Sequence, residues 1–290
     1  MRRTLIRAVE DRGLAARIVA THPVAGLSSG SALLRVGDEL WAVHDDAFRV
    51  TRISLPSLAT SAWVLKDDGR PLPKRDKPDF ESAVRTADGM IHLLGSGSAP
   101  PRRRIARLQA DRSSATFDDR PALYDCVCAA LALAGPPNIE GALVEGDRLR
   151  LFHRGVGAQP SAIADLPLGS LHDEPPAVLA VAAFDLGMLD GVALSFTDAA
   201  GLGGGRCVFV ATAEDTPDAV SDGPVAGSVV GLVEARAARW ARLVYADGRP
   251  SADKVEGIAL DDDRRGAWIL TDADDPSRPA LLGRVELAGF

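Results

Sequence analysis

Apolar and polar positions along this chain alternate in short stretches that repeat. Each copy is a short apolar stretch, a tight turn carrying Gly-Asp, Asp-Gly or an acidic run, and a second stretch rich in β-branched, aromatic and leucine residues. The clearest copies begin at Ser31, Glu81 and Glu140 and align without a gap, and looser copies begin at Asp190 and Glu256. The first residues are therefore 50, 59, 50 and 66 positions apart. A strand, a tight turn and a second strand predict a β-hairpin in every copy.

Further apolar stretches fill the spacing between hairpins, so each period holds about four strands. After the first hairpin these stretches are Phe48–Ile53 and Ser61–Leu65. Four-stranded units that repeat at this period are typical of a β-propeller. The copies predict five blades; six is the alternative, if the residues before Ser31 or the long step from 190 to 256 contain another blade. Because no linker-like stretch separates the copies, we expect residues 1–290 to form a single domain.

The two ends of the chain are expected to meet in the last blade. The final hairpin, at 256–271, is followed by only one more strand, Leu281–Leu287. An outer strand supplied by Thr4–Val9 or Arg17–Ala20 would close the ring and cover both sheet edges.

One segment departs from the strand pattern. Proline at 121, glycine at 135 and alanine-rich residues at helical spacing between them predict a short helix near 122–133. We expect this helix on the outside of the second blade.

Composition excludes several classes of protein. The chain has 290 residues, 46% of them apolar and 25% charged, which is the composition of a globular protein. With 33 basic and 40 acidic residues it carries a formal charge of −7, which argues against a nucleic-acid partner. Its three cysteines are too few for a disulfide framework. No apolar run approaches the roughly 18 residues of a membrane helix and no signal-peptide pattern is visible, so we expect a cytoplasmic protein with no membrane partner.

The first residue of each inner strand is the most informative for chemistry. In a propeller these strands begin at the central channel, and four of the five first residues are acidic: Glu81, Glu140, Asp190 and Glu256, with Ser31 in the fifth place. Four carboxylates converging on one axis either protonate, with raised pKa values, or bind a cation. A hard divalent cation, Ca²⁺ first, suits such oxygen ligands. The alternative is that the acids hold channel waters and cap strand-start amides.

A second set of polar residues follows the returning strand of each hairpin and is expected at the same face. These candidate substrate-binding residues are Asp45, Ser96, Arg154, Asp215 and Asp272, to which Ser31 is added from the inner-strand positions. Arg103, in the basic run 102–104, would add a positive sector to the mouth. Such a mouth suits a small anionic molecule held between a metal and an arginine. Simple solvation of these loop ends is the alternative.

Short phrases around these positions carry a resemblance to known proteins. They include Asp79-Phe-Glu81-Ser, Asn138-Ile-Glu140-Gly and Val255-Glu256-Gly. The chain resembles an uncharacterised family of bacterial β-propeller proteins and, more distantly, is similar to esterase-like phytase and SMP-30/gluconolactonase-like propellers. The distant resemblance implies a central divalent ion that polarises a phosphate or lactone, with Glu81, Glu140, Asp190 and Glu256 as its ligands. The predicted ring departs from the lactonase-type centre, which mixes asparagine with acids.

Two functions follow as hypotheses. The first is a divalent-metal-dependent hydrolase of an anionic ester or lactone, in which Glu81 or Glu140 takes the proton and Arg154 or Arg103 holds the anion. The second is a non-catalytic propeller that binds a ligand or another protein through its loop face.

Overall fold

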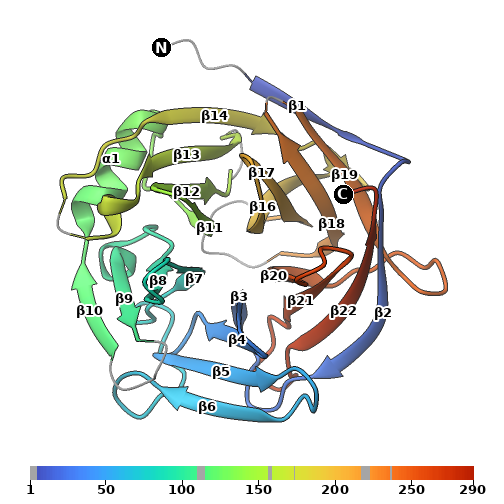
Figure 1. Ribbon diagram of the computed structural model, residues 1–290, viewed down its shortest axis with the longest axis horizontal. Helices are drawn as coiled ribbons and strands as arrows, with labels where there is room; N and C mark the ends of the chain where they lie inside the picture. Colours follow the sequence, from blue (N-terminus) through green and yellow to red (C-terminus); the bar gives the residue numbers. More distant parts are fainter. Residues whose placement is uncertain (1–4, 110–114, 156–158, 173, 217–222, 236) are drawn as a thin grey trace.

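The chain folds into a ring of β-sheets around a central axis (Figure 1). The computed structural model describes residues 5–109, 115–155, 159–172, 174–216, 223–235 and 237–290. β-Strands dominate throughout these ranges.

Consecutive strands pair in antiparallel groups of four. The first two groups are β3 (Gly30–Val36), β4 (Glu39–His44), β5 (Arg49–Ser54) and β6 (Thr60–Val64), then β7 (Phe80–Arg85), β8 (Ile91–Gly95), β9 (Arg104–Leu108) and β10 (Ala115–Asp119). The third group is β11 (Ile139–Glu145), β12 (Arg148–His153), β13 (Ser161–Pro167) and β14 (Ala180–Asp185). The fourth is β16 (Val192–Gly203), β17 (Arg206–Glu214), β18 (Val225–Glu234) and β19 (Ala237–Tyr245), with the short β15 (Met188–Leu189) beside β16. The last is β20 (Lys254–Leu260), β21 (Gly266–Asp272), β22 (Leu281–Ala288) and β2 (Ala15–Pro23).

The hydrophobic core is divided into layers between adjacent groups. One layer packs Trp41 and Val50 of the first group against Leu93 of the second. Another joins the third and fourth groups through Phe152 and Phe196, whose rings meet edge to face with centroids 5.3 Å apart. Each sheet therefore packs on its neighbours face to face, which is the architecture of a β-propeller.

The N-terminal segment closes the ring, as the sequence predicts for Arg17–Ala20. Strand β2 pairs antiparallel with β22, with Ile18 opposite Val285, and becomes the outer strand of the last group. The other candidate segment lies elsewhere: β1 (Leu5–Glu10) runs parallel to β14 over its first half and to β19 over its second, and so links two neighbouring groups. Thr4 lies outside the described residues.

A helix lies where the alanine-rich pattern predicts one, at α1 (Pro121–Leu131). Its buried side chains pack on the third group as well as on the second. The hydroxyl of Tyr124 donates a hydrogen bond to the carbonyl of Gly95, 2.8 Å away. The helix therefore lies against the second group, as expected, and also covers the junction of that group with the third.

Every inner strand has an irregularity, near its start in four of the groups and in the middle of β16 in the fourth group. The pairing with the following strand skips one residue, a β-bulge, at Ser31, Glu81, Glu140, Thr197 and Glu256. A bulge leaves one residue out of the ladder and redirects its side chain. The repetition of this bulge places one equivalent residue per group near the axis.

Candidate functional site

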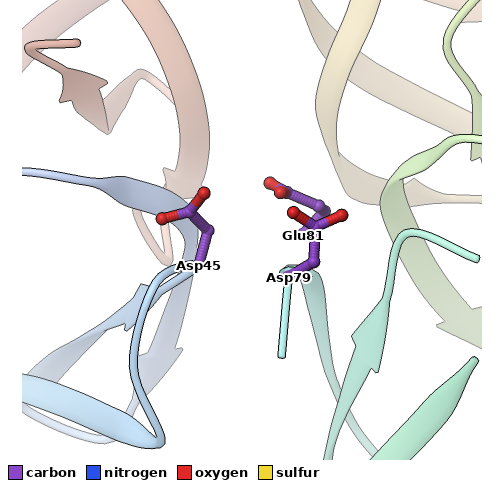
Figure 2. A group of neighbouring side chains, drawn as sticks. All are labelled: Asp45, Asp79 and Glu81. Carbon is purple, nitrogen blue, oxygen red and sulfur yellow. The ribbon is translucent and has the colours of Figure 1, made fainter. Parts of the chain in front are cut away.

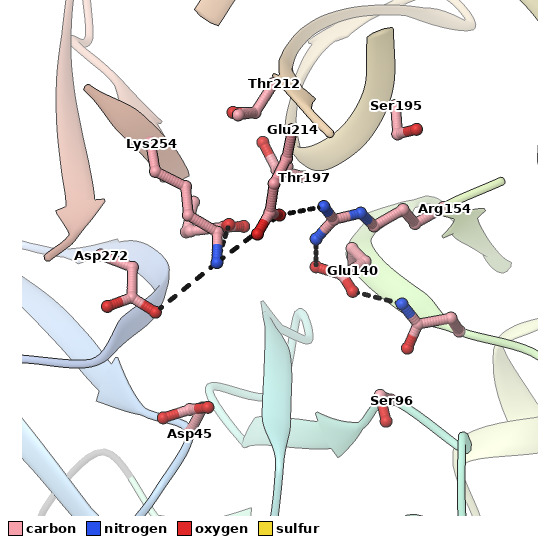
Figure 3. A network of polar contacts seen from close by, with 12 residues as sticks. Asp45, Ser96, Glu140, Arg154, Ser195, Thr197, Thr212, Glu214, Lys254 and Asp272 are labelled. Atoms are coloured by element: carbon pink, nitrogen blue, oxygen red, sulfur yellow. Dashed lines mark hydrogen bonds and ion pairs between the residues drawn. The ribbon is translucent and has the colours of Figure 1, made fainter. Parts of the chain in front are cut away.

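A charged pocket lies at the centre of the ring, where the inner strands begin (Figure 3). We call it the central pocket. Its charged lining residues are Asp45, Asp79, Glu81, Glu140, Glu214, Glu256 and Asp272, with Lys74, Lys77, Arg102, Arg154 and Lys254. Seven carboxyl groups thus face five basic groups among the described residues. The site is acidic, but its own side chains neutralise most of the charge.

The bulge residues behave in two ways. Glu81, Glu140 and Glu256 line the pocket with their carboxyl groups. The two hydroxyl residues instead bond to the next group: Ser31 Oγ donates to the carbonyl of Phe80 at 2.5 Å, and Thr197 Oγ1 to that of Val255 at 2.6 Å. At the bulge position, hydroxyl side chains therefore connect neighbouring sheets, and carboxyl side chains line the pocket.

The placement of Asp190 in the acidic ring is wrong. Asp190 lies in the turn between β15 and β16, with a left-handed backbone at φ 51°. Its exposed carboxylate accepts hydrogen bonds from Arg242, the shorter at 2.6 Å. Asp190-Gly191 imitates the Glu-Gly phrase because turns favour these residue types. The true equivalent in the fourth group is Thr197.

Arg103 does not reach the central pocket either, and its neighbour Arg102 does. Arg103 forms an ion pair with Asp125 of helix α1 at 2.7 Å. The short 3₁₀-helix Pro100–Arg102 turns the chain so that Arg102 points inward, where Nη1 donates to Asp79 at 3.1 Å and to Ser98 at 3.0 Å. The basic run therefore does contribute a positive charge to the central pocket, through Arg102 and not through Arg103.

Some of the candidate substrate-binding residues line the central pocket and others do not. Asp45, Arg154 and Asp272 line the central pocket, as does Ser31. Ser96 is buried behind it and donates a hydrogen bond to Asp79. Asp215 is exposed and lines a neighbouring cleft instead.

Asp79 and Lys254 line the pocket although neither stands out in sequence. Each precedes the bulge residue of its group by two positions, as Asn138 precedes Glu140. Lys254 and Glu256 both belong to β20, and residues two apart on a strand share a face, so this offset is the signal that would have found Lys254. Asp79 comes before β7 and has a left-handed backbone at φ 54°, so strand alternation does not place it.

On one side of the pocket the carboxylates are paired with bases. Arg154 bonds to Glu214 and lies 3.8 Å from Glu140, while Lys254 lies 3.7 Å from Glu214 and 3.5 Å from Glu256 (Figure 3). Burial alone would raise the pKa of Glu214, but Lys254 and Arg154 hold it below its ordinary value. This side is a network of ion pairs, in which burial still raises the pKa of Glu256 well above its ordinary value and its Oε2 has no hydrogen-bond partner among the described residues.

The other side contains a cluster of three acids, Asp45, Asp79 and Glu81 (Figure 2). One oxygen of each lies within 4.8 Å of the others, a spacing that could hold a metal ion. Carboxylate oxygens suit a hard divalent cation, and the buried Asp45 Oδ1 has no hydrogen-bond partner in the described chain. Lys77 Nζ, however, bonds to Asp45 and lies 2.8 Å from Asp79. The cluster fits a cation if Lys77 gives up these contacts.

Glu81 is distinct from the other pocket acids. Among the described residues it is the one carboxyl group of the central pocket with no basic group within 4 Å. Burial, followed by the charges of Asp79, Glu140 and Asp45, raises its pKa well above the ordinary value, against the opposing effect of Lys77. Burial also raises the pKa of Glu256 well above the ordinary value and that of Asp272 to about 7, so the lack of a basic neighbour distinguishes Glu81 and the raised pKa does not. A carboxyl group with a raised pKa and no basic neighbour is suited to accepting a proton.

The sequence pattern of one protein family, DUF6929, matches residues 26–287. The chain belongs to this family of unknown function. No curated protein matches this DUF6929 chain. The uncharacterised family expected from the sequence phrases is thus consistent with the match.

Solved structures support the fold of the DUF6929 chain. It is similar to glutaminyl cyclase of Myxococcus xanthus, with a TM-score of 0.51 and 10% identity over 98% of this chain and 100% of that one. A luciferin-regenerating enzyme gives a TM-score of 0.50 and 9% identity over 93% of this chain and 95% of that one. At such identities the likeness concerns the propeller fold alone. Within the described residues, no helix has the length and apolarity needed to cross a bilayer.

Proposed function

We propose that the central pocket binds a small molecule and hydrolyses an ester or lactone bond in it, with Glu81 as the general base. The observation that carries this proposal is the isolation of Glu81 from the basic groups that pair every other acid of the pocket. A base must be free to take a proton, and a raised pKa makes a carboxylate a stronger proton acceptor. Activity is then expected to rise with pH through the raised pKa of Glu81.

The neighbouring residues have supporting roles in this proposal. Asn138 Nδ2 donates to Glu140 Oε1 at 2.5 Å, and Arg154 lies on the other side of that carboxyl group, so Glu140 is fixed beside Glu81. The positive charge of Lys77 acts to lower the pKa of Glu81. We expect its ammonium group to stabilise negative charge that develops on the substrate oxygen.

The proposal has a second form, in which the pocket also binds a divalent cation, Ca²⁺ first. Asp45, Asp79 and Glu81 would hold it. Such an ion supplies polarisation of the scissile oxygen and a more acidic bound water. Glu81 is then a ligand, and Glu140 becomes the base. An anionic substrate would need the positive charge of this cation, because the basic groups of the pocket are already neutralised by carboxylates. These groups are Lys77, Arg102, Arg154 and Lys254.

We further propose that the antiparallel groups are the five blades of a single propeller spanning residues 1–290. The layers of apolar side chains between adjacent groups support this count.

A second candidate function is a non-catalytic propeller that binds a ligand or a protein partner through this face. It is favoured by the ion pairs of Arg154 and Lys254, in which acids and bases of different sheets neutralise one another as they do in structural networks. The acids of the pocket would then serve the stability of the ring.

The test is hydrolysis of a panel of carboxylic esters, lactones and phosphoesters by chelator-treated protein, with and without Ca²⁺, Mg²⁺ or Mn²⁺. Glu81→Gln is expected to lower activity by about 10²–10⁴-fold, the usual contribution of a general base. Glu140→Gln should have this effect only where the cation is required. Asp190→Asn is the matched control and should retain full activity. Full activity of Glu81→Gln would overturn the assignment, and no hydrolysis with no effect of metal on stability would favour the binding function.

A further inference from the structure

A second cavity adjoins the central pocket, between the third and fourth groups of strands. It is a cleft of about 500 Å³ bounded by β14 on one side and by β15 and the start of β16 on the other. Cavities of this size hold small organic molecules. We call it the side cleft.

The side cleft adjoins the central pocket. Arg154 and Glu214, which bond to each other, line both cavities, as does Thr216. We expect a molecule bound near Glu81 to reach into the side cleft past this pair.

The lining of the side cleft is more apolar than that of the central pocket. Leu186, Val192 and Leu194 form part of its wall. Met188 and Leu5 also line it and keep 60% and 49% of their surface exposed to solvent. Large apolar side chains exposed beside a cavity are typical of a surface that an apolar ligand covers.

The charges of the side cleft indicate which kind of ligand part it accepts. Asp185, Glu214 and Asp215 line it, against Arg154 as its one base in the described chain, and Arg154 is already bonded to Glu214. A negatively charged tail is disfavoured in such surroundings.

We propose that the substrate is amphipathic, with its ester or lactone group in the central pocket and an uncharged alkyl chain in the side cleft. The inference rests on the proposed function for the identity of the reacting group, and on the side cleft for the chain. It names the class of substrate as an ester or lactone with an apolar tail.

The experiment compares two lactones that share one ring, δ-valerolactone without a tail and δ-decalactone with a pentyl tail. Binding is measured by calorimetry on the Glu81→Gln protein, and hydrolysis by pH-stat on the wild type. Each methylene removed from water tightens binding by a factor of about four, so a half-covered pentyl chain is expected to give about 30-fold. Equal binding of the two lactones, or no binding of δ-decalactone, would overturn the proposal.

Variants of the cleft wall locate the effect. Ala193 is exposed and lines the side cleft, so Ala193→Trp fills the cavity and should reduce the 30-fold preference to about twofold. Ala180→Trp, at an exposed position of β14 outside the cleft, is the control and should keep it. Met188→Asp should lower the preference as well and serves if Ala193→Trp does not fold. A preference that survives both cleft variants contradicts the proposal.

Failure of the proposed function gives a different result. If neither lactone is hydrolysed but δ-decalactone binds with the cleft-dependent preference, the hydrolase is excluded and the tail site stands. If both are hydrolysed at the same rate and bind equally, the hydrolase stands and the tail site is excluded.

Discussion

Two glutamates on opposite sides of the central pocket have opposite electrostatic surroundings. Glu214 bonds to Arg154, lies 3.7 Å from Lys254 and accepts the backbone N–H of Gly223 at 3.0 Å. Glu81 has no such partner among the described residues, and its nearest charges are acids. The pKa of Glu214 is accordingly lowered and that of Glu81 raised.

This difference distinguishes a carboxyl group that stabilises the fold from one that is available for chemistry in the same pocket. A paired carboxylate stabilises the charges of its neighbours and stays ionised. A buried carboxyl group without a counter-ion costs free energy in its charged form, and such groups occur where function requires them. We therefore infer that Glu214 holds sheets together and that Glu81 is available for proton transfer or for a cation.

The largest effect is expected from removing the charge of Glu214. Glu214→Gln leaves Arg154 without its principal partner and should lower the free energy of unfolding by about 3 kcal/mol, the usual cost of breaking a buried ion pair. Denaturant unfolding at pH 7 measures this. A loss below about 0.5 kcal/mol would show that the network does not stabilise the ring.

Replacing Glu81 by glutamine should raise the free energy of unfolding, whereas Glu214→Gln lowers it. Between its ordinary and its raised pKa, the folded protein keeps a proton that the unfolded chain has released, so stability falls as pH rises through that window. Glu81→Gln removes this cost and should gain about 1–3 kcal/mol at pH 8, comparable to the cost of an unsatisfied buried group. The gain should vanish near pH 4, where both states are protonated. Unfolding of both proteins across this pH range tests the sign, and destabilisation at pH 8 would contradict it.

A smaller effect is expected from Lys77, which occupies the acid cluster in place of a cation. Lys77→Met frees Asp45 and the Oδ1 atom of Asp79 for an ion, while Arg102 keeps Oδ2 of Asp79, so added Ca²⁺ should stabilise this variant more than the wild type. At ten times the dissociation constant the gain is about 1.4 kcal/mol. Thermal unfolding with and without Ca²⁺ provides the comparison, with Lys66→Met as an exposed-lysine control. An equal response of the three proteins would exclude competition between Lys77 and the ion.

No effect is expected at Asp190. Its carboxylate is exposed and pairs with Arg242 on the outer side of the fourth group. Asp190→Asn should therefore leave the melting temperature, the response to Ca²⁺ and any hydrolysis unchanged. If this variant lost the response to Ca²⁺, Asp190 would have to be one of the acids that bind the ion.

The repeated phrase predicted the propeller and three of the pocket acids because the phrase and the bulge coincide. In the copies that begin at Glu81, Glu140 and Glu256 the bulge residue is the first residue of the phrase. In the fourth group the bulge residue is Thr197, which lacks the charge of Glu81, Glu140 and Glu256 and the glycine that follows the last two. Alignment by residue type therefore chose Asp190 in the preceding turn.

Other parts of the site depend on geometry that the sequence does not state. A single 3₁₀ turn decides that Arg102 and not Arg103 faces inward. The pairing of bases with acids, and hence the isolation of Glu81, depends on side chains from several sheets meeting at one axis. By contrast, the two-residue offset that places Lys254 is present in the sequence and could have been used, whereas Asp79, with its left-handed backbone, is not placed by it.

The central claim is tested most directly by the pKa of Glu81 itself. Carbon NMR of protein labelled at the glutamate side-chain carboxyl carbon, with the resonance assigned by its absence in Glu81→Gln, follows this single group through a pH titration. The account predicts a titration well above the ordinary glutamate value of 4.5, and one that moves down when Ca²⁺ binds. A titration at or below 4.5, unaffected by Ca²⁺, would show that Glu81 is an ordinary paired carboxylate and would contradict both its role as a base and its role as a ligand.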